Sequence, residues 1–352
     1  MTTTRFKHFL LPVLLVALAG CGGSGDPGEP GSSDVLTGPP VPTQGPEPSV
    51  GPSGRCPTAH PGPGTLTVVK APAPCNDGPL WSGWRCVVLQ STANTNGVTY
   101  QVEARWNVVD RKPVGSWTWL VGGRSGAFFR EGTTRANSVQ DALVGDQIRS
   151  IDLKFLGTSG TQAFPRNGWV NISAVYADVL QWLVRNKVAE GVVGHVGSSG
   201  GATLIAAALA NQGCHKYLDG VILGGGPWWI DLNQLCAQGS QAPKSLIDDW
   251  TWREMDGSRP CQQGRGADPS FDCMSILGST SVKHYFKTKV AVLVGTQDPN
   301  GTFIAGEAQN WLSRITAESK SFERPATGHN VLSGAAGSNR VLALVRQITA
   351  AS

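Results

Sequence analysis

The segment that most constrains the fold of this chain is a glycine–serine turn between two apolar runs, at residues 191–210. The run "GVVGHV" has the length and composition of a buried strand, and the alanine-rich run "ATLIAAALA" favours a helix. The turn "GSSGG" joins them directly. A buried strand that passes at once into a helix predicts a sheet with helices packed against it.

This turn holds a candidate nucleophile, because Gly197, Ser199 and Gly201 fit the pattern G-x-S-x-G. A serine at so sharp a turn has a strained backbone, and side chains two positions before or after it would collide with the neighbouring strand and helix. The helix N-terminus also directs N–H groups toward a developing negative charge. Ser198 is the alternative nucleophile, but it breaks the glycine spacing. A plain Gly/Ser turn fits the same five residues, so the prediction depends on the strand and helix around it.

A serine nucleophile needs a base and an acid that orients the base, and at strand–turn–helix sites these follow in the order serine, acid, histidine. Asp298 ends the apolar run "KVAVLVGTQD", so its carboxylate is expected at the C-terminal edge of the sheet. His329, in "ERPATGHN", is the only histidine after Asp298. The sequence thus predicts a catalytic triad of Ser199, Asp298 and His329. The alternative is that Asp298 belongs to a turn and His329 to a loop.

The same pattern assigns roles to residues around the triad. Asp231 follows an earlier apolar strand and is the second candidate for the acid, whereas His195 lies inside a strand and is expected to be structural. An oxyanion hole needs two N–H donors. Gly200, directly after the serine, is one, and Gly123 or Arg124, in the loop "LVGGRSGAFF", is the candidate for the other.

The rest of the chain alternates strand and helix patterns. Predicted strands cover residues 86–92, 99–110, 116–123, 150–157, 191–196, 218–226, 289–298 and 321–326. Predicted helices cover residues 171–187, with Asn171 as candidate cap, 202–211 and 338–350. The predicted fold class is α/β, with a mostly parallel twisted sheet and helices on both faces. The segment 227–286 interrupts this alternation and is expected to be a cap or lid insertion.

Residues 84–350 resemble a serine hydrolase of the α/β-hydrolase fold, on the motifs "GHVGSSGG", "GTQD" and "TGH". The resemblance implies an acyl-enzyme route, in which His329 takes the proton of Ser199, Asp298 orients the imidazole and backbone amides hold the oxyanion. It implies no metal and no organic cofactor. A very large superfamily shares these motifs, so they indicate hydrolysis rather than a particular substrate.

The substrate expected is a small-molecule or polymeric ester, because no charged specificity pattern is evident. The segment 227–286 carries the tryptophans Trp228, Trp229, Trp250 and Trp252, which predict either an apolar acyl pocket or core packing of an irregular segment. A peptidase is an alternative, since "GGRSG" is similar to the Gly-Gly-Pro-Gly loop of proline-directed aminopeptidases, with arginine in place of proline. An acyltransferase and a noncatalytic surface-binding lipoprotein are the others.

The N-terminus predicts export. Residues 1–20 combine a positive start with a short apolar core, as secretory signals do. The motif Leu18-Ala19-Gly20-Cys21 resembles a bacterial lipobox, which implies cleavage before Cys21 and a lipid anchor on it. The alternative is a plain secretory signal. Gly22 rather than aspartate implies the outer membrane in a Gram-negative host. Residues 21–64 then form a disordered Gly/Pro/Ser-rich tether, and residues 65–352 the hydrolase domain.

Cysteine usage and charge complete the sequence picture. Export makes disulfides plausible, and the favoured pairs are Cys75 with Cys86 and Cys261 with Cys273, with Cys214 and Cys236 as a looser third. Cys56 makes the count after Cys21 odd, so at least one thiol is left over or pairs with another chain. No metal-site spacing is present. The chain is 15% charged with a net charge of +4 and no Lys/Arg-rich run, so nucleic acid is not an expected partner.

Overall fold

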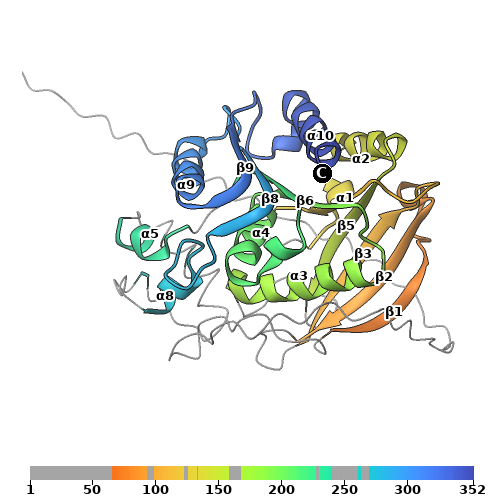
Figure 1. The fold of residues 1–352 in the computed structure, drawn as a ribbon, viewed down its shortest axis with the longest axis horizontal. Coiled ribbons are helices and arrows are strands. Elements are labelled where there is room, and N and C mark those ends of the chain that lie inside the picture. Colours follow the sequence, from red (N-terminus) through yellow and green to blue (C-terminus); the bar gives the residue numbers. More distant parts are fainter. Residues whose placement is uncertain are drawn as a thin grey trace, which may run out of the picture. The chain divides into compact units, whose positions relative to one another are not determined.

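The fold is built on one nine-stranded sheet (Figure 1). The computed structural model describes residues 66–92, 99–122, 126–132, 134–157, 168–226, 230–238, 244, 247, 261–262 and 269–352. The strands are β1 (Leu66–Pro74), β2 (Trp84–Ser91), β3 (Tyr100–Asn107), β4 (Gly115–Leu120), β5 (Ile148–Gly157), β6 (Val192–Ser198), β7 (Gly220–Gly224), β8 (His284–Leu293) and β9 (Thr316–Glu323). Their order in the sheet is β1-β2-β3-β5-β4-β6-β7-β8-β9.

The sheet is antiparallel at its start and parallel thereafter. β1, β2, β3 and β5 pair antiparallel in succession. From β5 through β4, β6, β7 and β8 to β9 every pairing is parallel. The carboxyl ends of six strands therefore share one edge, where sheets of this kind hold their functional residues.

Helices cover both faces of the sheet, as Figure 1 shows for α3 and α4 on one side and α2 and α10 on the other. The helices are α1 (Phe129–Gly132), α2 (Thr134–Gly145), α3 (Gly168–Arg185), α4 (Gly200–Asn211), α5 (Leu232–Gln238), α8 (Pro269–Met274), α9 (Gly301–Arg314) and α10 (Ala335–Ala350). Short 3-10 turns cover Pro79–Trp81, Cys214–Lys216 and Val331–Ser333.

The strand sequences explain the two-sided cover. In β7, Val221 and Leu223 belong to the apolar core beneath α3 and α4, whereas Ile222 belongs to the core beneath α2 and α10. β8 alternates in the same way. Side chains alternate across a strand, so a strand buried on both faces reads as a continuous apolar run.

Several elements differ from the sequence expectation. α3 begins at Gly168, so Asn171 lies inside its first turn and is not the cap. β1, α2 and α9 are elements that the sequence patterns did not predict. Within the described part of 227–286, α5 and α8 are helical. The four tryptophans of that segment lie outside the described residues, so the lid stays a prediction, as do the signal, Cys21 and the tether at residues 1–64.

The cysteine pairing departs from the sequence expectation at the later cysteines. Cys75 and Cys86 lie together as favoured, with Cα atoms 5.3 Å apart. Cys236, however, pairs with Cys261. The favoured pair of Cys261 with Cys273 and the looser pair of Cys214 with Cys236 are therefore both wrong. Cys214 is a free, buried thiol. The long insertion between β7 and β8 thus closes a loop within itself, a contact that spacing along the chain cannot reveal.

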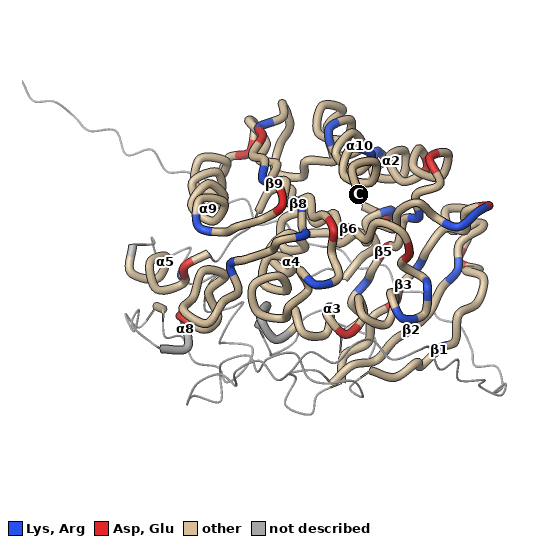
Figure 2. Tube along the Cα trace, viewed as in Figure 1, with Lys and Arg blue, Asp and Glu red and all other residues tan. Residues whose placement is uncertain are grey.

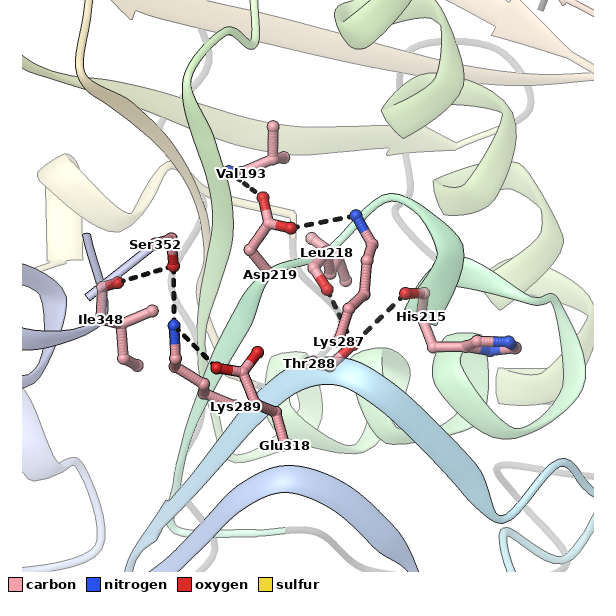
Figure 3. A network of polar contacts seen from close by, with 10 residues as sticks. All are labelled: Val193, His215, Leu218, Asp219, Lys287, Thr288, Lys289, Glu318, Ile348 and Ser352. Carbon is pink, nitrogen blue, oxygen red and sulfur yellow. Dashed lines mark hydrogen bonds and ion pairs between the residues drawn. The ribbon is translucent and has the colours of Figure 1, made fainter. Parts of the chain in front are cut away.

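The edge of the sheet opposite the carboxyl ends is joined by polar contacts, seen in Figure 3. The Asp219 carboxylate, just before β7, accepts hydrogen bonds from Val193 N–H at 2.9 Å and Lys287 Nζ at 3.0 Å. Lys289 Nζ donates to Ser352 Oγ at 2.7 Å and pairs with Glu318 at 3.2 Å. These contacts link β6, β7, β8, β9 and the end of the chain.

Charged residues of both signs are interspersed along the described trace (Figure 2). Among the residues that the structure describes, no helix is long and apolar enough to cross a membrane.

Candidate active site

Ser199 sits at the junction of β6 and α4 in a backbone conformation that is rare for a residue with a side chain. β6 ends at Ser198 and α4 begins at Gly200, which leaves Ser199 alone at the turn, with φ 50° and ψ −115°. Its N–H donates to Gly224 O at 2.7 Å, at the end of the neighbouring β7. Such strain costs on the order of 1–3 kcal/mol and persists only where the surroundings enforce it.

The glycines on either side of Ser199 are required by space, as the sequence predicted. A Cβ on Gly197 would lie 2.8 Å from the Ala202 nitrogen, in α4. A Cβ on Gly201 would lie 2.3 Å from Leu120 O, at the end of β4. Both distances are shorter than a carbon can approach backbone atoms, so the prediction of collisions with helix and strand is confirmed.

The structure brings the three predicted triad residues into one chain of hydrogen bonds. His329 Nε2 lies 2.8 Å from Ser199 Oγ, and His329 Nδ1 lies 2.7 Å from Asp298 Oδ2. The Asp298 side chain is fully buried, whereas that of His329 is 35% exposed. The other Asp298 oxygen accepts a hydrogen bond from Asn300 N–H at 2.8 Å. The carboxylate is thereby fixed, and the imidazole lies between it and the serine hydroxyl.

The loops that carry the acid and the base are packed against each other. Gln297 N–H donates to Thr327 O at 3.0 Å, which joins the loop after β8 to the loop after β9. Gly295 allows this contact, since a Cβ there would lie 2.2 Å from Thr327 O. Gly225, with φ +63°, gives the same close approach beside His329 O. Asp298 and His329 are therefore held by backbone contacts as well as by their own hydrogen bond.

Two backbone segments border the nucleophile as an oxyanion hole would. Gly200 is the first residue of α4, so no intrahelical bond requires its N–H. Gly122 faces Ser199 from the end of β4, where a Cβ would lie 2.9 Å from Ser199 Cβ and 3.6 Å from Oγ. Gly123 and Arg124, the sequence candidates for the second donor, lie outside the described residues. Gly122, the first glycine of the pair in "LVGGRSG", was not a sequence candidate, and it is the described residue of that loop that lies against Ser199.

Asp231, the second candidate for the acid, and His195, the histidine inside β6, have structural roles. Asp231 Oδ1 accepts a hydrogen bond from Gln234 N–H at 3.0 Å, which caps α5. The carboxylate that contacts His329 Nδ1 is that of Asp298 and not that of Asp231. His195 is fully buried in β6, with Nδ1 2.6 Å from Thr118 Oγ1 and 3.0 Å from the Tyr176 hydroxyl. Burial lowers the pKa of His195 well below its ordinary value, which keeps the ring neutral.

Within the described part of the chain, no three His, Cys, Asp or Glu side chains are grouped as metal ligands would be. The site consists of the serine, the histidine, the aspartate and the surrounding backbone. Chemically, this arrangement can deprotonate a hydroxyl while it attacks a carbonyl carbon and can stabilise the oxyanion that results.

Comparison with solved structures shows that the chain has the α/β-hydrolase fold. A protein from Agrobacterium vitis S4 named as a hydrolase is 13% identical, with a TM-score of 0.52 over 74% of this chain and 97% of that one. A thermostable carboxyl esterase from Bacillus coagulans is 12% identical, with a TM-score of 0.49 over 75% and 99%. An esterase from Pyrococcus furiosus is 12% identical, with a TM-score of 0.48 over 79% and 98%.

The comparisons confirm the predicted fold class and leave the activity open, because identities this low establish only the fold. No protein-family model matches the chain. No curated protein is similar to it in sequence.

Proposed function

We propose that the protein is a serine hydrolase that cleaves carboxylic esters through an acyl-enzyme intermediate. One observation carries the proposal. An unbroken chain of hydrogen bonds, 2.8 Å and 2.7 Å long, runs from Ser199 Oγ through His329 to the buried Asp298. A serine in a strained turn with such partners is the arrangement that activates a hydroxyl as a nucleophile.

The mechanism follows from these positions. His329 Nε2 takes the proton of Ser199 Oγ while the oxygen attacks the ester carbonyl carbon, and the carbonyl oxygen becomes an oxyanion beside the N–H of Gly200 and the backbone at Gly122. The C–O bond to the alcohol then breaks, and His329 returns its proton to the leaving alkoxide. Water attacks the acyl-enzyme by the same route, which releases the acid and restores Ser199. Asp298 holds the ring tautomer and stabilises the imidazolium.

An ester is proposed as the substrate because the sequence around the site carries no charged specificity pattern. A peptidase or an acyltransferase would use the same three residues, and a noncatalytic binding protein would not need their alignment. We also propose export and lipid anchoring at Cys21, on the signal and lipobox pattern of the sequence.

Steady-state kinetics with p-nitrophenyl esters of two to sixteen carbons test the proposal, with p-nitroanilides of the same acids as the peptidase comparison. We expect the esters to be turned over by the full-length protein. Ser199→Ala and His329→Ala should each lower kcat by roughly 10⁴-fold or more, and Asp298→Asn by about 10³- to 10⁴-fold. Each variant must show the circular dichroism spectrum of the parent.

A folded parent that turns over no ester would remove the esterase proposal. Turnover of the anilides alone would favour the peptidase. Ester consumption that accelerates with added alcohol, with a new ester as product, would favour acyl transfer.

A further inference from the structure

The chain passes Ser199 at Gly122 and then enters the protein interior, where Phe128 and Phe129 are buried. After β4 ends at Leu120, the chain passes Ser199 at Gly122. It is anchored again at Phe129 and Arg130, where α1 begins. We call the described residues 121–122 and 126–130 the β4–α1 segment. Its near end, at Gly122, borders the site that would hold the oxyanion. Its far end, at residues 126–130, is where the chain is fixed to the rest of the protein.

Two backbone N–H groups at the far end are bound by one carboxylate, while the Phe128 ring packs against Trp81 and the Arg130 side chain donates to Leu80 O at 3.0 Å. Asp152 Oδ1 accepts a hydrogen bond from Phe129 N–H, and Asp152 Oδ2 accepts one from Arg130 N–H, both at 2.8 Å. Gln140 Nε2, from α2, also donates to Oδ2 at 3.3 Å. Two oxygens that each receive one backbone N–H fix both the place and the direction of the segment, which apolar packing alone does not do.

Asp152 itself sits on a rigid support. It is fully buried in β5, in register with Trp119 of β4 on one side and Arg105 of β3 on the other. A carboxylate in the middle of a sheet is costly to bury unless hydrogen bonds satisfy it. Its two bonds to the β4–α1 segment supply that satisfaction, and they account for a carboxylate at this position.

We propose that Asp152 is a positioning residue for the oxyanion hole. It holds the far end of the β4–α1 segment and so keeps the backbone at Gly122 next to the oxyanion that forms on attack by Ser199. The inference rests on the proposed function. A displaced backbone N–H donor weakens only the interaction with the oxyanion, which is made in the transition state. Loss of Asp152 should therefore lower kcat and leave KM nearly unchanged.

The charge state of Asp152 gives a second readout. Burial raises the pKa of Asp152 to about 7, while the N–H groups of Arg130 and Phe129 and the Gln140 amide oppose the shift. The charged groups around it are Arg130 and Glu131 on α1, Asp141 on α2 in an ion pair with Arg130, Arg105 on β3 and Lys154 on β5. Protonated Asp152 has one good acceptor oxygen left and resembles asparagine.

The test compares Asp152→Asn with the parent, using the full-length protein and p-nitrophenyl butyrate. We expect kcat to fall by about tenfold to a hundredfold at pH 8, with KM changed by less than about threefold. The ratio of the parent's kcat to the variant's should shrink toward one as the pH falls through about 7. A merely structural role would not move this ratio with pH.

Asp178→Asn is the matched control, since Asp178 is also a buried carboxylate but accepts its hydrogen bond from Ser91 Oγ, on β2. It should keep the parent's kcat whatever it does to stability. If Asp152→Asn does not fold, the Gln140→Leu variant tests the positioning role instead. It removes one donor to Asp152 and should lower kcat by roughly two- to fivefold at pH 8. The ratio of the parent's kcat to the variant's should again shrink as the pH falls through about 7.

The outcomes separate the two proposals. An active parent beside a folded Asp152→Asn variant of equal kcat, or a Gln140→Leu variant of equal kcat where Asp152→Asn fails to fold, overturns the positioning role alone. A folded parent without turnover overturns the proposed function, and the positioning role with it. A loss in kcat that tracks pH as described supports both.

Discussion

At the scale of single residues, the strained conformation of Ser199 depends on its glycine neighbours. The positive φ of Ser199 brings β6, α4 and the end of β4 so close together that no side chain fits at Gly197 or Gly201. The strain is thus enforced by packing on three sides, which also aims the hydroxyl at His329.

Gly201→Ala tests this dependence. The added Cβ would lie 2.3 Å from Leu120 O and 2.9 Å from Val121 O, so β4 must move away from the turn. We expect a loss of about 1–3 kcal/mol in the free energy of unfolding and a fall in kcat larger than that loss of stability explains. Urea denaturation and ester kinetics measure the two.

Gly306→Ala is the control for that substitution. Gly306 lies on the exposed side of α9, and an added Cβ there would meet nothing within 4 Å. Alanine at this position should raise the free energy of unfolding by about 0.5–1 kcal/mol and leave kcat unchanged. Equal effects of the two substitutions would contradict the dependence of Ser199 on its glycine neighbours.

Single residues could be predicted from the sequence where their chemical type and their position at the end of an apolar run point to the same site. The order of serine, acid and histidine, each at the end of an apolar run, was enough to select three residues that the structure brings within hydrogen-bonding distance. Asp152 gave no such signal, because a single acid inside "SIDLKFLG" reads as an ordinary strand residue. Its partners are backbone N–H groups more than twenty positions away along the chain.

At the scale of elements, the carboxyl ends of the parallel strands carry the site, and their other ends are tied together by side chains. Figure 3 shows Asp219 between Val193 and Lys287 at this second edge. A carboxylate that accepts a backbone N–H from the adjacent strand fixes where β6 and β7 begin, and so where Ser199 and Gly224 meet at the other edge.

Asp219→Ala should therefore destabilise the sheet. It leaves the Val193 N–H without its acceptor, and we expect the free energy of unfolding to fall by about 1–2 kcal/mol. Lys287→Met removes only the half-exposed partner and should cost under about 1 kcal/mol. Equal losses in urea denaturation would show that the ion pair, rather than the backbone bond, carries the effect.

Elements were predictable from the sequence where their apolar pattern is strong. β6, β7, β8, α3 and α10 are strongly apolar or strictly periodic, and all were predicted within a few residues of their bounds or, for β8, over its second half. β1 was missed because it is an exposed edge strand with two prolines, and α2 because half of its residues are polar. The pairing of Cys236 with Cys261 could not be predicted, since it depends on how the insertion folds.

At the scale of the whole molecule, one buried carboxyl links stability to pH. The folded pKa of Asp152 is about 7, above the value of about 4 in an unfolded chain. Between these values the folded protein holds a proton that the unfolded chain has lost, so stability falls as pH rises from about 4 to about 7. The carboxylate form that would position the β4–α1 segment is thus the less stable one.

Urea denaturation of the parent and Asp152→Asn at several pH values tests this linkage. The variant has no carboxyl to titrate at this position. The free energy of unfolding of the variant, relative to that of the parent, should therefore rise between pH 5 and pH 7, by on the order of a few kcal/mol. Over the upper part of that range its relative kcat should decline. Parallel stability curves would show that Asp152 keeps an ordinary pKa in the folded state.

The activated serine can be detected without knowledge of the natural substrate, by labelling the full-length protein with a fluorophosphonate and analysing its peptides by mass spectrometry. We predict a single adduct on the peptide that contains Ser199, formed quickly by the parent and absent from folded Ser199→Ala and His329→Ala variants. A folded parent that stays unlabelled in excess probe, or an adduct on another serine, would contradict the assignment of Ser199 as an activated nucleophile.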